Sequence, residues 1–172
     1  MGTVSYELYL QSTVMTPPAQ FAELFERHYA AVYRAALRIT GNPADAEDVL
    51  QSVFLRILNQ SSHLDPAQLP EAYFRRSATN AAIDLLRRRL FRAESPFDEA
   101  YPHAVVESPV FLKERLRRAI ASLEQGDAEV FLLRYVEGLS NAELAEMFGQ
   151  DKNNIAVRLH RIRQTLQTQL ER

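Results

Sequence analysis

The sequence predicts an all-α protein built from two small helical domains joined by a flexible linker. Glycine is scarce, at 5 of 172 residues, tryptophan is absent, and Ala, Leu, Arg, Glu and Gln are frequent, a composition that favours helix over sheet. Apolar residues also recur at intervals of three and four along most of the chain. With 47% hydrophobic residues, the chain can bury one sizeable core or two small ones.

Composition divides the chain into four segments. Residues 1–17 read as a disordered extension, in which Met15 is an alternative start to Met1. Residues 18–91 form the first predicted domain, 92–108 an acidic, proline-containing linker, and 109–172 the second domain. The chain has no cysteine, no apolar run long enough for membrane insertion and no secretory signal. These features predict a cytoplasmic protein.

The first domain opens with two amphipathic helices. Apolar residues follow helical spacing from Phe21 to Leu37, and Gly41 ends this stretch. Asn42 and Pro43 then cap and start a second helix, whose inner stripe runs from Ala46 to Ile57.

The outer face of the second helix combines acidic and amide groups with one exposed apolar residue. The five residues predicted to form this surface are Asp45, Asp48, Gln51, Ser52 and Leu55. An acidic rim around a leucine suits docking of another protein. The alternative is an ordinary solvated face, since exposed leucines are common and acidic residues complement a helix N-terminus.

A long helix is predicted from about Glu71 to Leu90, after a proline-containing loop over residues 61–70. Its inward residues include Phe74, Ala78 and Leu85. Six residues on or next to its outer strip carry groups that suit bases and phosphates: Tyr73, Arg76, Asn80, Asp84, Arg87 and Arg88. A solvated face with Arg–Asp pairs is the alternative.

The second domain begins with two shorter helices. We expect the first to start at Ser108-Pro109, with Phe111, Leu112 and Ile120 facing inward. The second is expected near residues 128–136.

A helix-turn-helix pattern closes the chain. Ser140 and Glu143 form a capping box for a short helix, and Gly149 suits the left-handed residue that ends it. Asp151 caps the next helix, whose inward stripe starts at Ile155. Seven residues of that helix are predicted to contact the DNA major groove: Lys152, Asn153, Asn154, Val157, Arg158, His160 and Arg161. The alternative is a helical hairpin with a solvated charged face.

Charge and motif content limit the classes of function. The net charge is −2, which is unfavourable for a protein that binds DNA alone, because phosphate contacts supply much of the affinity. Basic residues are local, around Arg87 and Arg161, so a partner is expected to supply further affinity. No phosphate loop, catalytic triad or metal-ligand spacing is present. We therefore expect neither an enzyme nor a metal or cofactor site.

The order of the segments resembles the extracytoplasmic-function (ECF) sigma factors of the sigma-70 family. Residues 45–55 (DAEDVLQSVFL) and 80–88 (NAAIDLLRR) resemble two signatures of sigma region 2. Residues 131–140 (FLLRYVEGLS) and 158–163 (RLHRIR) are similar to region 4, the promoter-binding helix-turn-helix domain. The resemblance extends from about Phe21 to Leu170, with the motifs in the expected order.

This resemblance implies a role and partners for each surface. The face carrying Asp48 and Leu55 would dock on the β′ clamp of core RNA polymerase, and the β flap would be a further polymerase contact. The strip from Tyr73 to Arg88, with the preceding loop, would melt and hold the −10 element of promoter DNA. The last helix would read the −35 element. An anti-sigma factor is a further partner that the family suggests.

Departures from the family pattern concern the DNA target. The family usually has tryptophan where Tyr73 or Phe74 stands, and proline where Glu124 stands. In the recognition turn, Asn154 and Ala156 replace a hydroxyl residue and a lysine. We therefore expect a shifted −35 preference. Two other classes remain as alternatives: a stand-alone helix-turn-helix regulator and a helical adaptor that binds only protein.

Overall fold

The computed structural model describes residues 19–60, 69–93 and 109–171. These parts of the chain contain seven α-helices and no strand. The predicted all-α class is therefore confirmed for the described residues. The predicted extension over residues 1–17 lies outside them, as do most of the loop over 61–70 and nearly all of the predicted linker.

The first helical block consists of α2 (Ala19–Thr40), α3 (Pro43–Gln60) and α4 (Glu71–Ala93), which pack against one another. Gly41 has φ 68°, and the Asn42 side chain accepts hydrogen bonds from the backbone N–H groups of Ala44 and Asp45 at 2.9 and 3.3 Å. This sharp turn reverses the chain between α2 and α3. Phe54 and Phe74 are fully buried where the three helices meet.

The second helical block consists of α5 (Pro109–Ser122), α6 (Gln125–Tyr135), α7 (Asn141–Phe148) and α8 (Lys152–Leu170). Its core residues include Leu133, Leu144 and Ile155, none of which has measurable exposure. The predicted burial of Phe111 and Leu112 is wrong, since their exposed fractions are 52% and 53%. Burial in α5 is confined to its last turn, from Ala119 to Ala121, where the helix packs on its neighbours.

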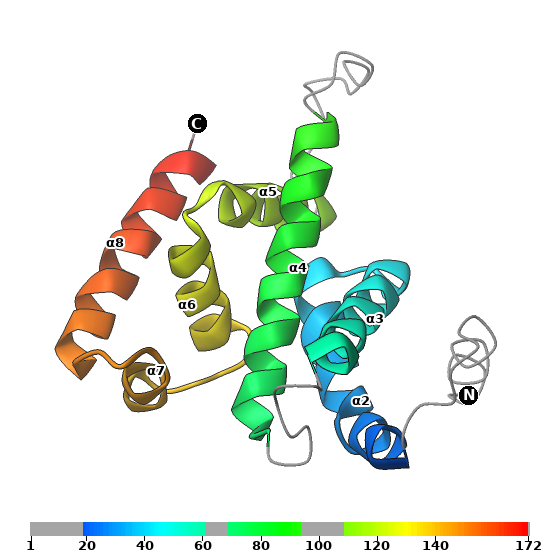
Figure 1. Ribbon diagram of the computed structural model, residues 1–172. Helices are drawn as coiled ribbons and strands as arrows, with labels where there is room; N and C mark the ends of the chain where they lie inside the picture. The colour runs from blue at the N-terminus through cyan, green and yellow to red at the C-terminus, as the bar shows by residue number, and fades with distance from the viewer. Residues whose placement is uncertain (1–18, 61–68, 94–108, 172) are drawn as a thin grey trace.

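The two blocks are packed together along α4. Figure 1 shows α4 in green at the centre, with α2 and α3 on one side and α5 and α6 on the other. The buried apolar residues of both blocks belong to one continuous cluster. Helical periodicity predicted the blocks but gave no sign of this contact.

No helix in the described ranges is both long and apolar enough to cross a membrane.

Candidate functional site

The helix-turn-helix is held by the local interactions that the sequence predicts. Ser140 Oγ accepts from the N–H of Glu143 at 3.2 Å, and Glu143 Oε2 accepts from the N–H of Ser140 at 2.7 Å. The Ser140 hydrogen bonds lower the pKa of the Glu143 carboxyl. Gly149 ends α7 with φ 60°, and Asp151 caps α8 by accepting from the N–H of Asn153 at 2.7 Å. These caps set the angle at which α8 leaves the turn.

The outer face of α8 is exposed over its first half. Six of the seven residues predicted to contact DNA are exposed: Lys152, Asn153, Asn154, Val157, His160 and Arg161. Val157 is 58% exposed although it is apolar, while Ile155, Leu159 and Ile162 on the opposite side are buried. The face therefore offers amide, guanidinium and methyl groups that could contact base edges.

Arg158 is the exception among these seven residues. Its Nε donates to Asp127 Oδ1 at 2.7 Å, and its guanidinium lies beside Gly126 in α6. Only 22% of its side chain is exposed. Arg158 therefore joins α8 to α6 in this conformation.

The outer face of α3 is also exposed, apart from Asp45. Asp48, Gln51 and Ser52 are exposed, and Leu55 is 42% exposed. Asp45 is instead buried, at 7% exposure, and pairs with Arg89 of α4. Burial raises the pKa of the Asp45 carboxyl, against the opposing effect of Arg89. Asp45 thus ties α3 to α4, and the accessible face begins at Asp48.

The outer strip predicted on α4, from Tyr73 to Arg88 and called the α4 strip below, makes contacts within the molecule. Arg76 Nε donates to Glu129 Oε1 of α6 at 2.6 Å, and Asn80 Nδ2 donates to the same oxygen at 2.9 Å. The Arg76 guanidinium also lies 4.9 Å from the ring centroid of Phe148 in α7. Glu129 is only 5% exposed.

Arg87 lies further along the same strip and contacts the turn between α5 and α6. It donates to the carbonyl oxygens of Ala121 at 3.2 Å and Leu123 at 2.5 Å, and to the Gln125 side chain. Tyr73 is half-buried beside Phe74, whereas Asp84 and Arg88 are exposed. Arg76, Asn80 and Arg87 therefore face α6 and the turn before it. Asp84 and Arg88 of the same strip remain exposed.

Sequence reasoning did not identify the α6 partners of this strip. Glu129 stands between the buried residues Ala128 and Val130, and Gln125 lies one helical turn before it. A carboxylate within an apolar run is a sequence signal that could have drawn attention to α6, because charged residues are rarely buried unless paired. It does not name the partner.

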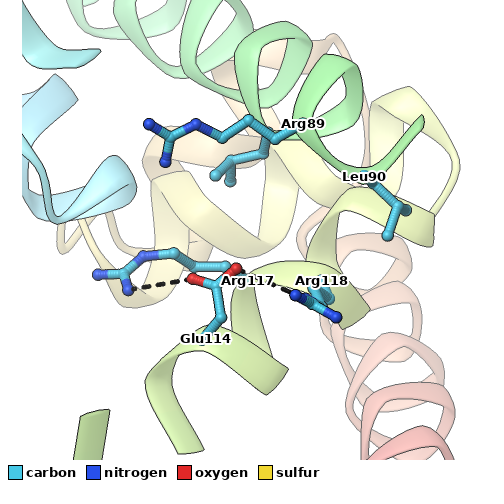
Figure 2. Close-up of a pocket in the computed structure, with 6 residues that line it drawn as sticks. Arg89, Leu90, Glu114, Arg117 and Arg118 are labelled. Carbon is cyan, nitrogen blue, oxygen red and sulfur yellow. Dashed lines mark ion pairs between the residues drawn. The ribbon is translucent and has the colours of Figure 1, made fainter. Parts of the chain in front are cut away.

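A small pocket lies further along the boundary between α4 and α5. Figure 2 shows Arg89 and Leu90 of α4 facing Arg117 and Arg118 of α5, whose guanidinium groups lie 3.9 and 3.5 Å from the Glu114 carboxylate. Its volume is about 90 Å³, below the usual range for ligand sites of roughly 300–1,000 Å³. Arg117 also donates from Nε to the carbonyl of Ile39 at 3.0 Å, next to Gly41. This end of the boundary is therefore held by arginine contacts as well.

Two family profiles match the chain in the order of its two blocks. The Sigma-70 region 2 profile matches residues 24–91, and the Sigma-70 region 4 profile matches residues 113–166. The first range covers α3, most of α2 and nearly all of α4, and the second runs from within α5 into α8.

Relatives support the same assignment. The chain is 31% identical over 156 residues to the ECF RNA polymerase sigma factor SigE of Mycolicibacterium smegmatis, covering 86% of this chain and 60% of that protein. It is 31% identical over 145 residues to the RNA polymerase sigma factor CarQ of Myxococcus xanthus, covering 82% and 83%. A solved structure of CnrH in complex with the cytosolic domain of CnrY matches with a TM-score of 0.51 and 25% identity, over 88% of this chain and 87% of that one. The chain belongs to the ECF sigma factors of the sigma-70 family.

Proposed function

We propose that this chain binds core RNA polymerase and directs transcription initiation at promoters with −10 and −35 elements. The observation that carries the proposal is the set of exposed amide, guanidinium and methyl groups on α8, the second helix of a capped helix-turn-helix. Membership of the ECF sigma factor family implies that core RNA polymerase is the partner. The proposed location is the cytoplasm, where polymerase and promoter DNA are found.

The α3 face is the proposed polymerase contact. Leu55 would bury its apolar side chain against the β′ clamp, and Asp48, Gln51 and Ser52 would make polar contacts around it. The β flap is a further proposed contact. Docking on polymerase supplies affinity that a chain of net charge −2 lacks for DNA alone. Contacts to phosphates then position the protein, and contacts to bases specify the promoter.

The α4 strip is the proposed contact with the melted −10 element. Tyr73 offers a stacking surface, Asn80 hydrogen-bonding groups, and Arg76, Arg87 and Arg88 offer cations for phosphates. Because Arg76, Asn80 and Arg87 contact the second block here, this role requires the second block to move away from α4.

The α8 face is the proposed −35 contact. Arg161 and Asn153 would donate to base edges, Val157 would contact a thymine methyl group, and Lys152 would contact phosphate. Arg158 would contribute once its pair with Asp127 is exchanged for a DNA contact. We also propose an anti-sigma factor as regulator, by analogy with the CnrH structure, which was solved with the cytosolic domain of CnrY.

The decisive experiment combines polymerase binding with run-off transcription from fragmented genomic DNA. The purified chain should form a complex with core polymerase and produce defined transcripts whose start sites share −10 and −35 sequences. Asp48→Arg should abolish both complex and transcripts, whereas Glu23→Arg, at an exposed acidic residue of α2, should change neither.

Two outcomes would contradict the proposal. Absence of a complex with core polymerase, together with specific binding of duplex DNA, would indicate a stand-alone regulator. Normal transcription by the Asp48→Arg variant would remove the α3 face from the docking surface.

A further inference from the structure

The three consecutive arginines near the end of α4 have different surroundings. Arg87 contacts the turn between α5 and α6, Arg88 is exposed, and Arg89 reaches Asp45 in the first turn of α3. A basic run beside the α4 strip suggests DNA contacts at all three positions. Arg89 differs, because its guanidinium is occupied by a carboxylate of the helix that carries the proposed polymerase contact.

Asp45 depends on Arg89 for compensation of its charge. Arg89 Nη2 donates to Asp45 Oδ1 and forms an ion pair with Oδ2. The Asp45 side chain is only 10% exposed, and Oδ2 is buried and accepts no hydrogen bond with normal geometry from the described residues. A carboxylate shielded from water to this degree is costly unless a cation stays beside it. Loss of Arg89 would therefore force the first turn of α3 to move or the carboxylate to protonate.

Arg117 of α5 is a second cation near Asp45, but its donors are used elsewhere. Figure 2 shows the Arg89 and Arg117 side chains extending to the same side of the boundary between α4 and α5. Burial raises the pKa of the Asp45 carboxyl, and Arg117 opposes this change less than Arg89 does. Arg117 Nε donates to the carbonyl of Ile39 at 3.0 Å, and its guanidinium lies 3.9 Å from the Glu114 carboxylate. The hydrogen bond to Asp45 therefore comes from Arg89.

The pair lies at the N-terminal end of the proposed docking face. Asp48 and Ser52 follow Asp45 by three and seven residues, so the three residues share one side of α3. The Asn42 side chain caps this turn by accepting from the N–H of Asp45 at 3.3 Å. Apolar packing sets the distance between α3 and α4, whereas a paired buried charge fixes their register. The first turn of α3 is thus held by its cap and by Arg89.

We infer that Arg89 is a positioning residue for polymerase docking: through the buried Asp45 carboxylate it holds the first turn of α3, so that Asp48 and Leu55 are presented to polymerase in one orientation. The inference rests on the proposed function for the identity of the docking partner. The positioning itself rests on contacts within the first block. Asp45 then acts inside the protein and does not make the direct polymerase contact that the sequence predicts for it.

The positioning is tested in the full-length free chain by hydrogen exchange of the backbone N–H groups of residues 44–50. Arg89→Gln leaves the Asp45 carboxylate without its cation, so exchange in this segment should become several times faster. The double variant Asp45→Asn/Arg89→Gln removes the uncompensated charge and should return exchange to near the parent rate. Arg38→Gln is the matched control, since it removes an arginine 2.8 Å from another nearly buried carboxylate, that of Glu137, outside α3. It should leave exchange of residues 44–50 unchanged.

The consequence for docking is measured as the affinity of the full-length chain for core RNA polymerase, by fluorescence anisotropy. Arg89→Gln should weaken binding at least about fivefold, and Asp45→Asn/Arg89→Gln should restore it to within about twofold of the parent. Asp45→Asn alone should also stay within about twofold, because the Arg89 side chain is 47% exposed and can be hydrated without its partner.

The double variant separates positioning from direct contact. If Arg89 touched polymerase itself, both variants that lack it would bind equally weakly, and this result would overturn the inference. A loss of affinity in Asp45→Asn equal to that in Arg89→Gln would assign the direct contact to Asp45 and would also overturn it. Ile57→Val, at a buried residue near the other end of α3, controls for a general loss of stability. An equal loss of affinity in Ile57→Val would remove the specific role of the pair.

Failure of the proposed function gives a different result. If the parent chain does not bind core polymerase, the proposed function is refuted, whereas exchange of residues 44–50 still shows whether Arg89 holds the first turn of α3. Parent-like exchange in Arg89→Gln, together with normal polymerase binding, would overturn the positioning and leave the proposed function in place.

Discussion

The α4 strip and the outer face of α8 have similar side chains but different surroundings. Both present arginine and amide groups, yet Arg76, Asn80 and Arg87 of α4 contact the second block, while Asn153, Val157 and Arg161 of α8 are exposed. The difference shows that composition alone does not reveal whether a surface with side chains suited to DNA is accessible. One such surface is available in this conformation, and the other is engaged by the molecule itself.

The largest expected effect concerns the buried side of α8, which supports its exposed face. Ile155 has no measurable exposure, so Ile155→Ala should lower the free energy of unfolding by about 2–5 kcal/mol. Val157→Ala, two residues away and 58% exposed, should change it by less than about 0.5 kcal/mol. Urea unfolding followed by far-UV circular dichroism measures both. Equal losses would contradict the assignment of the two sides.

The next effect separates the two surfaces directly. Arg87→Ala removes a charged donor from two carbonyl groups and the Gln125 side chain, so it should lower the free energy of unfolding by about 1–2 kcal/mol. Arg161→Ala should change it by less than about 0.5 kcal/mol, because the exposed Arg161 side chain makes no hydrogen bond or ion pair with the described residues.

The proposed function adds a second readout for the same pair of variants. Both should reduce promoter-directed transcription, through the −10 element for Arg87→Ala and the −35 element for Arg161→Ala. A stability loss in Arg161→Ala equal to that in Arg87→Ala would remove the distinction between the occupied and the accessible surface.

A smaller effect is expected where the α8 face is positioned by α7. Ser140→Ala removes the hydroxyl that caps α7, which is one half of the capping box, and this should cost about 1 kcal/mol of unfolding free energy. Thr165→Ala is the matched control, because its hydroxyl only bonds back to the Arg161 carbonyl within α8 at 3.1 Å. Thermal unfolding of the two variants side by side tests this, and a larger loss in Thr165→Ala would contradict it.

The smallest expected effect is a pH dependence that belongs to the first block. His28 stacks on Phe74 with ring centroids 3.9 Å apart, and burial, with a contribution from Arg27, lowers the pKa of this histidine although Glu71 opposes the change. The folded state then binds fewer protons at His28 than the unfolded state does. Stability should therefore fall as the pH drops from about 6.5 through the lowered pKa of the folded chain.

The histidine prediction has a direct check. Melting temperatures measured between neutral and mildly acidic pH should depend less on pH in His28→Gln than in the parent chain. His160→Gln, at an exposed histidine of α8, should keep the parent's dependence because it leaves His28 in place. An unchanged dependence in His28→Gln would assign the effect to other groups.

Much of the fold could be predicted because its signals are local. The capping box at Ser140, the left-handed Gly149 and the apolar stripe of α8 depend on residues within about one helical turn of one another. The family assignment was equally accessible, since residues 45–55 and 80–88 form continuous motifs. The prediction that Phe111 and Leu112 are buried was wrong. Residue spacing predicts which side of a helix is apolar, but it does not predict how far the neighbouring helices extend along that side.

The sequence by itself determined the helices, their caps, their apolar sides and the chemistry of three candidate surfaces. Only the tertiary structure decided that Asp45 is buried against Arg89 and that the α4 strip faces Glu129. The reason is separation along the chain: Arg76 and Glu129 lie 53 residues apart, and Arg38 and Glu137 lie 99 apart. Helical periodicity relates neighbours a few residues away, whereas contacts between blocks depend on how two completed surfaces fit together.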